Sequence, residues 1–215
     1  VVTCIICIVA GTATAYLKVR KNSKAARMFE SAASLTYALP GIVLALAMIF
    51  HWTIVPGVYG TVKILMIAYA TRYVVLQIKG STTAMLSVEP ALEEAGRVFG
   101  AGKVTIWKKI MIPVMAKQIL SSAFLIFVSS LTELTLSSML ASAGTKTIGL
   151  TIFNLQQGGD YSLSAAMSAV IVFIVFFVYS LMALVKKKDE EDAKRPKVQE
   201  SSLEEVGEHA VGQGV

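Results

Sequence analysis

Two long stretches of this sequence contain no charged side chain: Ser31 to Phe50 and Ser162 to Val185. A helix rises 1.5 Å per residue, so a stretch of about 20 residues is long enough to cross the hydrocarbon core of a bilayer. The two stretches therefore predict membrane helices.

Three weaker stretches complete a set of five predicted spans. The third span contains Lys63 and Arg72, and the fourth contains Glu133 as its one acidic residue. In order, the predicted spans cover residues 1–17, 31–50, 57–78, 117–140 and 162–185. The composition agrees with them, because a chain that is 55% hydrophobic with a mean hydropathy of +0.66 is too apolar for a soluble domain. We predict an all-α, polytopic membrane helix bundle over residues 1–185.

Basic side chains are unevenly distributed around these spans. All but three of the 20 Lys and Arg residues fall in segments 18–30, 79–117 and 186–197, and the exceptions are Lys63, Arg72 and Lys146. Cytoplasmic loops retain Lys and Arg, so we expect the three segments inside, the N-terminus outside and the tail in the cytoplasm. The net charge of +6 is therefore explained by contact with membrane lipid and does not indicate a nucleic-acid partner.

The two ends of the chain differ in character. Residues 186–215 begin basic, turn acidic at Asp189 to Asp192 and lack the apolar residues for a core, so we expect a disordered cytoplasmic tail. The chain starts with Val1 inside an apolar run, without the basic region that begins a signal peptide. We expect a fragment, or the later part of a longer polypeptide.

Reactive groups suited to enzyme chemistry are scarce. His51 and His209 are the only histidines, and the C-x2-C pair Cys4 and Cys7 lies in a predicted span with no second pair. We therefore expect no metal site, no cofactor and no catalytic triad. The phosphate-binding pattern G-x4-G-K-S/T is also missing, so any ATP is expected to be hydrolysed by another chain.

Residues 88–113, between the third and fourth spans, are the least membrane-like part of the middle of the chain. Leu92, Ala95, Gly96 and Phe99 recur at i, i+3, i+4 and i+7 and so share one helical face. The small side chains of Ala95 and Gly96 would leave a shallow spot on it, where another protein could approach.

Proline and glycine positions divide this segment into two parts. Pro90 suits the first turn of a helix, Gly100 and Gly102 suit its end, and a second helical stretch runs from about Thr105 to Pro113. We predict two short helices that meet at a glycine elbow.

The elbow carries a family pattern. Glu94, Ala95 and Gly96 are followed after three residues by Gly100, and nine residues later come Ile110, one residue and then Ile112-Pro113. This resembles the "EAA" loop of permease subunits in binding-protein-dependent ABC importers, whose pattern is Glu-Ala-Ala, three residues, Gly, nine residues, Ile, one residue, Leu-Pro. Gly96 replaces the second alanine and Ile112 replaces the leucine.

The resemblance implies a fold and a set of partners. The fold would be the core of a type I importer permease with about five spans, in the bacterial inner membrane. The loop would be a coupling helix that docks on a cytoplasmic ABC ATPase dimer. An external or periplasmic binding protein would deliver the substrate, and a second permease half would complete the pathway.

A second resemblance concerns the substrate. Residues 132–170 are similar to the "KEL…PPGTETL…G.Y..AAA" region of ferric-iron permeases, with Glu133 at that family's glutamate and Ser142-Ala143 where its proline pair would be. Residues 37–49, YALPGIVLALAMI, also resemble a span of that branch. The resemblance implies ferric iron as substrate and a later half of a fused permease. Permeases for phosphonate, thiamine and polyamines share much of this region and remain alternatives.

Several residues are candidates for a substrate path. Pro40 removes a helix hydrogen bond and bends the second span, so carbonyls near Thr36 and Tyr37 need another partner. Glu133 and Lys63 both fall roughly 10 Å below the outer surface at 1.5 Å per residue and could pair. We expect this pair, with Thr132 and Thr135 beside it, to help form the outer gate or path. An ordinary kink and a purely structural ion pair are the alternatives.

Arg72 falls near the inner end of the third predicted span, from where it is expected to reach lipid phosphates. An ion-coupled secondary transporter is the alternative from another functional class. Inverted repeats or several acidic residues inside the membrane would favour it, and the sequence has neither.

Overall fold

The computed structural model describes residues 1–184, so the predicted disordered tail at 186–215 lies outside the described residues. Residues 1–173 form one compact unit, and Ile174 begins a second. The helices are α1 (Val2–Val19), α2 (Lys24–Ala38), α3 (Gly41–Trp52), α4 (Val62–Leu86), α5 (Pro90–Val98), α6 (Lys103–Ile106), the π-helical turn η1 (Trp107–Met111), α7 (Ile112–Thr132), α8 (Thr135–Leu140), α9 (Ile148–Gln157) and a last helix, Tyr161–Leu184. Over residues 1–184 the chain contains helices and no strands.

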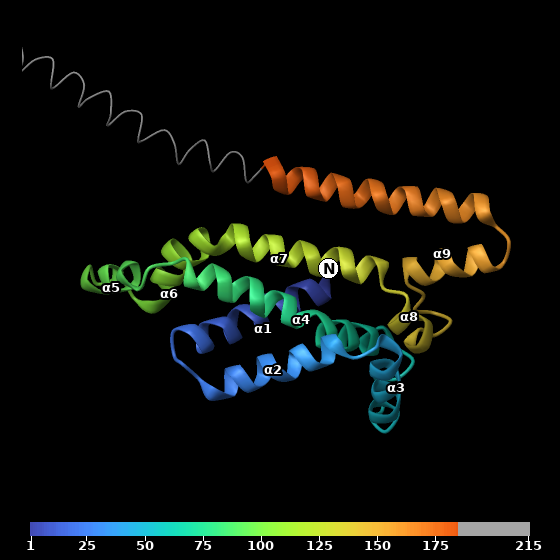
Figure 1. Cartoon of the computed structure of the whole chain (residues 1–215), viewed down its shortest axis with the longest axis horizontal. Coiled ribbons are helices and arrows are strands. Elements are labelled where there is room, and N and C mark those ends of the chain that lie inside the picture. The colour runs from blue at the N-terminus through green and yellow to red at the C-terminus, as the bar shows by residue number, and fades with distance from the viewer. Residues whose placement is uncertain (185–215) are drawn as a thin grey trace, which may run out of the picture. The chain divides into compact units, whose positions relative to one another are not determined.

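Helix α4 lies at the centre of the first unit. It contacts α1, α2, α3, α7 and α8 (Figure 1). Ile64, Ala68, Val75 and Ile78 on α4 are almost fully buried. The polar character of the third predicted span follows from this position, because a membrane helix that faces protein can hold ionisable residues at lower cost.

Three helices in the described part are long and apolar enough to cross a membrane: Val2–Val19, Lys103–Thr132 and Tyr161–Leu184. The α2–α3 pair would be a fourth if it counts as one span. The remaining predicted span corresponds to α4, a continuous helix whose apolar sequence is interrupted by Lys63, Arg72 and Lys79.

The second predicted span, 31–50, is broken rather than bent. Helix α2 ends at Ala38, α3 begins at Gly41, and their axes differ by 114°. Pro40 has no N–H, and a proline disfavours helical geometry in the residue before it, so Leu39 is extended with φ −66° and ψ 142°. The predicted kink at Pro40 is therefore a complete interruption of the helix.

The helix observed at the fourth predicted span, 117–140, begins and ends at other residues than predicted. One helix runs from Lys103 to Thr132, so a helix end at Pro113 was a wrong prediction. In η1, the N–H of Ile112 bonds to the carbonyl of Trp107, five residues back. This wider turn accommodates Pro113, whose ring would clash with a carbonyl in a regular helix interior.

Small residues allow the central helices to approach closely. A Cβ on Gly11 of α1 would lie 2.7 Å from Cβ of Gln77 on α4, and one on Gly80 would lie 2.4 Å from Cβ of Ser122 on α7. Beside these contacts, the Ser81 hydroxyl lies 3.1 Å from that of Thr12 and accepts a hydrogen bond from Gln77. Small residues with interhelical hydrogen bonds are the usual means of packing membrane helices.

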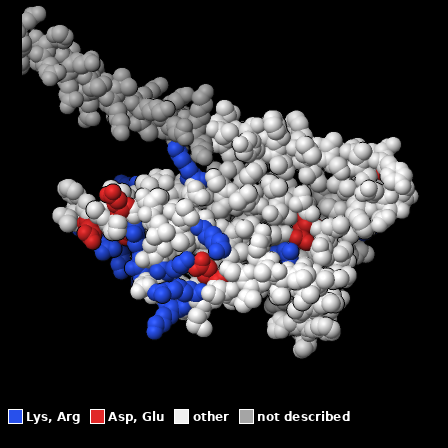
Figure 2. All heavy atoms as spheres, in the orientation of Figure 1, with Lys and Arg blue, Asp and Glu red and all other residues white. Residues whose placement is uncertain are grey.

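Basic side chains gather at one end of the first unit, over the α1–α2 turn, α5 and α6 (Figure 2). The turn and the α5–α6 elbow are in direct contact there, through Arg20 and Glu93. The two segments 18–30 and 79–117, which were predicted to lie on one side of the membrane, therefore contact each other at this end of the bundle.

Candidate functional site

The glycine elbow between α5 and α6 is built as the sequence pattern requires. Gly100 has φ +78°, and its N–H bonds to the carbonyl of Arg97 at 2.9 Å. The N–H of Ala101 bonds to the carbonyl of Gly96 at 2.9 Å. These two bonds define a Schellman motif, which ends a helix at a residue in the left-handed conformation that glycine adopts without strain. The family pattern therefore has a backbone reason for glycine at position 100.

The faces of α5 have different surroundings. Leu92, Glu94, Ala95 and Phe99 are exposed, and Phe99 shows 89% of its surface. Gly96 is buried: a Cβ there would lie 3.1 Å from Cδ1 of Ile110 and 3.2 Å from Cγ1 of Ile106. The expectation that Gly96 leaves room for another protein was thus wrong, because the elbow's own second arm fills that space.

The remaining residues of the pattern are divided in the same way. Ile110 is half-buried beneath Gly96, whereas Pro113 is exposed. Pro113 lies on the continuous helix Lys103–Thr132, called the long helix below. The pattern therefore combines exposed positions, which are open to a partner, with internal positions that set the angle of the elbow.

Sequence reasoning missed the contact that anchors the elbow. Nε of Arg20, at the end of α1, donates to Oε1 of Glu93 at 2.6 Å, and its Nη2 donates to the carbonyl of Val88 at 2.7 Å. Arg97 lies on the exposed side of the same carboxylate, at 3.6 Å. No helical periodicity links residues this far apart in sequence, so the pattern of α5 alone could not reveal the pair.

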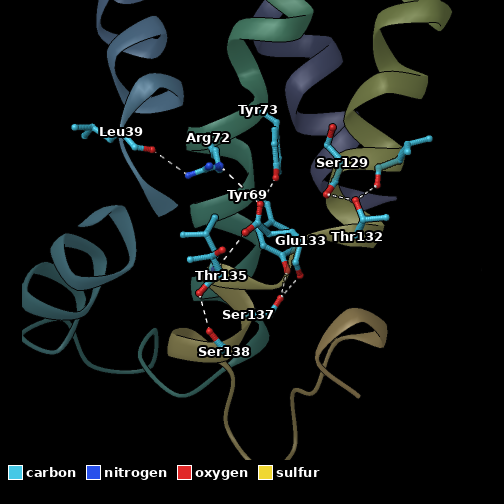
Figure 3. Close-up of polar contacts among 12 residues, drawn as sticks. Leu39, Tyr69, Arg72, Tyr73, Ser129, Thr132, Glu133, Thr135, Ser137 and Ser138 are labelled. Carbon is cyan, nitrogen blue, oxygen red and sulfur yellow. Dashed lines mark hydrogen bonds and ion pairs between the residues drawn. The ribbon is translucent and has the colours of Figure 1, made fainter. Parts of the chain in front are cut away.

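A second polar site lies where two interrupted helices meet α4 (Figure 3). Helix α7 ends at Thr132, the next residue, Glu133, is extended, and α8 begins at Thr135. The Glu133 carboxylate accepts hydrogen bonds from the Tyr73 hydroxyl and, at 3.1 Å, from the N–H of Leu136. It also lies 3.7 Å from Nε of Arg72. The carboxylate thus caps α8 and pairs with a cation on the central helix.

Arg72 connects this break to the one at Pro40. Its Nη1 donates to the carbonyl of Leu39 at 3.4 Å. The sequence led us to expect that carbonyls near Thr36 and Tyr37 need a partner. The carbonyl that Arg72 binds at this break is instead that of Leu39. Gly41 allows the close approach, since a Cβ there would lie 3.0 Å from Cβ of Thr135 and 3.2 Å from Nη1 of Arg72.

The predicted pair of Lys63 and Glu133 does not form. Lys63 is exposed at the start of α4, and Arg72 takes its place beside Glu133. The depth estimate failed because it carried one helix to Leu140, whereas α7 ends at Thr132. The expectation that Arg72 reaches lipid phosphates was wrong as well, because its side chain is only 18% exposed.

The second site opens into a pocket of about 360 Å³. Its lining includes three of the predicted path residues, Thr132, Glu133 and Thr135, and does not include Lys63 or Pro40. Tyr37, Arg72, Tyr73 and Ser129 supply further polar groups. Nowhere in residues 1–184 do three His, Cys, Asp or Glu side chains form a group that could hold a metal ion.

Comparison with known proteins places these features in a family. Residues 7–188 match the family described as "Binding-protein-dependent transport system inner membrane component". The "Ferric transport system permease protein FbpB" of Actinobacillus pleuropneumoniae is 24% identical over 170 residues, 78% of this chain and 25% of that protein. The "Spermidine/putrescine transport system permease protein PotC" of Haemophilus influenzae is 24% identical over 156 residues, 70% of this chain and 58% of that protein. The chain thus spans about a quarter of the first relative and somewhat over half of the second.

The fold also has a solved counterpart. A chain from a structure titled "Inward facing conformations of the MetNI methionine ABC transporter" superposes with a TM-score of 0.65 at 18% identity, covering 86% of this chain and 88% of that one. The likeness confirms the predicted all-helical membrane bundle of the importer permease type. The family comprises transport components, which agrees with the expectation that the chain is not an enzyme. The chain belongs to the family of multi-pass inner membrane components of binding-protein-dependent transport systems.

Proposed function

We propose that this chain is the membrane-spanning permease part of an ATP-driven ABC importer, and one half of the complete permease. A separate cytoplasmic ABC ATPase dimer drives it, and an external or periplasmic binding protein delivers the substrate. Binding and hydrolysis of ATP shift the bundle between outward-open and inward-open states, each favoured by a different partner. The second half of the permease is a separate chain or another part of a longer polypeptide.

The exposed face of α5 is the observation that carries this proposal. Leu92, Ala95 and Phe99 present an apolar surface beside Glu94 on a short helix outside the bundle. Such a surface on a helix suits insertion into a groove on another protein. The basic residues around it favour the cytoplasmic side, where an ATPase lies, so we propose that the α1–α2 turn and the elbow face inward.

The pocket at Glu133 is the proposed substrate path. Interrupted helices inside a membrane are tolerated where their free backbone groups meet protein or a polar cavity, and they often mark the substrate site of transporters. Here the breaks at Pro40 and Glu133 lie on either side of Arg72, and Thr132 and Thr135 line the opening.

Ferric iron is the proposed substrate, on the basis of the ferric-iron permease resemblance at residues 132–170 and of the ferric relative. Phosphonate, thiamine and polyamines are the alternatives, and one relative is named for spermidine and putrescine. In the pocket, Arg72 compensates the charge of Glu133. We therefore assign the choice of substrate mainly to the binding protein.

Co-purification from membranes tests the coupling role. The full-length permease is expected to retain an ABC ATPase, and Glu94→Lys or Phe99→Ser is expected to release it. Met28→Ser is the matched control, because Met28 is another exposed apolar residue, on α2, with 73% of its surface accessible. Retention of the ATPase by both α5 variants, or its loss in the control, would contradict the proposed docking face.

Uptake tests the substrate. Vesicles that contain the complete assembly and its binding protein are supplied with radiolabelled ferric citrate or spermidine, with and without internal ATP. We expect ATP-dependent uptake of iron. Uptake of spermidine alone would assign the polyamine alternative, and uptake that persists without any ATPase would favour a secondary transporter.

A further inference from the structure

The helices around the elbow are connected to it in two different ways. Helix α4 leads into α5 through residues 87–89, and α6 continues through η1 into α7. A displacement of the elbow therefore reaches α4 and α7 through the backbone. Helix α1 has no such connection, since Arg20 and Glu93 are 73 positions apart in sequence. Any movement of α1 with the elbow has to pass through side chains.

The polar part of this connection is Arg20. It reaches the Glu93 carboxylate at 2.6 Å and the Val88 carbonyl at 2.7 Å, so one guanidinium holds both the first half of α5 and the connection between α4 and α5. The two side chains are 15% and 9% exposed. Arginine suits this position because its planar group can donate in two directions at once. Its charge also complements the C-terminal end of α1.

The apolar part lies beside it. The Tyr16 and Trp107 rings pack edge to face with centroids 5.1 Å apart. Tyr16 and Val19 lie against a buried cluster from the end of α4 and the start of the long helix, whose core includes Met85 and Met111. The last turn of α1 is therefore fixed to both arms of the elbow.

The Arg20–Glu93 pair does not hold α1 on the bundle. Helix α1 packs along α4 through Gly11 and Cys7, far from the pair. A buried ion pair is also weak as a source of stability, because desolvation offsets much of its attraction, whereas it is effective at fixing one geometry. A role in fixing the angle between α1 and α5 agrees with both observations.

We propose that Arg20 is a positioning residue that makes α1 move together with the coupling helix when the ATPase closes. This inference rests on the proposed function. The Arg20–Glu93 pair then passes the displacement of α5 to α1, a neighbour that the backbone does not connect directly to the elbow.

Spin labels on either side of the pair test the inference in the assembled complex. Nitroxides are placed at Lys21, next to Arg20, and at Val98, the last residue of α5, in a chain with Cys4 and Cys7 replaced by Ala. Both positions are exposed. The distance between the labels is measured without nucleotide and with Mg-ATP and vanadate.

The native chain is expected to give one narrow distance in both states. Arg20→Gln is expected to give that distance without nucleotide but a broadened or shifted one with ATP and vanadate. Loss of a charge-assisted hydrogen bond corresponds to about tenfold in an equilibrium constant, so the population at the native distance relative to displaced geometries should fall by about that factor. Arg27→Gln is the matched control. Arg27 is an exposed arginine of α2 at the same end, and its hydrogen bonds within the described residues go to Asn22, in the turn just before α2.

Two further variants separate positioning from folding. Arg20→Lys keeps the charge but not the two-way geometry and is expected to fall between the native chain and Arg20→Gln. The exchange Arg20→Glu with Glu93→Arg is expected to restore part of the narrow distance with ATP.

Each outcome has a definite reading. A distance that is unchanged by ATP in both Arg20→Gln and Arg20→Lys would overturn the inference, as would an Arg20→Gln distance already altered without nucleotide. If the native assembly retains no ATPase, the proposed function itself fails. If it retains one and the variants behave as the native chain does, only the role of Arg20 fails.

Discussion

The pair between Arg72 and Glu133 can be measured with a double-mutant cycle. The four chains are the native one, Arg72→Gln, Glu133→Gln and the double variant. Each single change leaves the other charge without its partner in a site where the side chain of Arg72 is only 18% exposed and that of Glu133 only 9%. Removing one partner of a buried pair typically costs about 3–5 kcal/mol of unfolding free energy.

The geometry sets the expected size of the coupling. At the observed separation of 3.7 Å, Coulomb's law gives about 4.5 kcal/mol for unit charges at an effective dielectric constant of about 20. Without Arg72, the Glu133 carboxylate still accepts hydrogen bonds from the Tyr73 hydroxyl and the Leu136 N–H. Without Glu133, Arg72 still donates a hydrogen bond to the Leu39 carbonyl. These remaining contacts reduce the loss, so we expect a coupling free energy of about 2–3 kcal/mol.

A buried thiol provides the assay. Cys7 is fully buried in the core, and with Cys4 replaced by Ala it becomes the only cysteine. A thiol-reactive fluorophore then reports unfolding during a temperature ramp in detergent. A loss of about 3 kcal/mol lowers Tm by about 6–12 °C for a chain of this size. We expect each single variant to lower Tm by an amount in this range. The loss of unfolding free energy in the double variant should be about 2–3 kcal/mol smaller than the sum of the two single losses.

Lys63 provides the control for this cycle. Lys63→Gln should change the unfolding free energy by less than about 0.5 kcal/mol, because Lys63 is exposed. Additive losses from Arg72→Gln and Glu133→Gln would refute the pair. A coupling between Lys63 and Glu133 of the size expected for Arg72 would instead reinstate the pair predicted from sequence.

Two further predictions concern glycine. Gly100→Ala has to place a Cβ at φ +78°, which costs about 1–2 kcal/mol, so we expect this variant to retain less ATPase on co-purification. Gly102→Ala is the control and should retain the ATPase, because Gly102 has φ −67°. Equal retention by both variants would contradict the Schellman role of Gly100. Gly80→Ala brings a Cβ to 2.4 Å from Cβ of Ser122 and should lower the unfolding free energy by about 1–3 kcal/mol in the thiol assay. Ser122→Gly should restore most of that loss, and no restoration would mean that α4 and α7 do not cross at this point.

The elbow is the part of the site that the sequence predicted best. Its pattern is local, since the apolar face, the proline start and the stop at Gly100 all lie within α5 and the turn after it. Local backbone chemistry dictates such features. Even so, the pattern could not show which small residue faced inward, because Gly96 is buried by Ile106 and Ile110 from the next helix.

The second site shows why the rest escaped sequence reasoning. Pro40 was predicted to bend its span, and the structure has a helix break there. Glu133 was predicted to lie inside a continuous span and to pair with Lys63, whereas it lies at a second helix break. Depth along a helix was counted from predicted ends, so an error in where α7 stops moved Glu133 relative to α4. Arg72 was assigned to the membrane surface because its span was expected to end at residue 78, whereas α4 continues to Leu86.

The position of α4 corrects both errors with one physical argument. A helix with Lys63, Arg72 and Lys79 is too polar to be stable against lipid, so it requires protein around its middle. Within that protein shell a charge needs a counter-charge, and Glu133 is the only acidic residue inside a predicted span. Of the three cations, Lys63 and Lys79 lie toward the ends of α4, where water or head groups are within reach. Only Arg72 lies near the middle of the helix, so the carboxylate at the end of α7 is the partner that it requires.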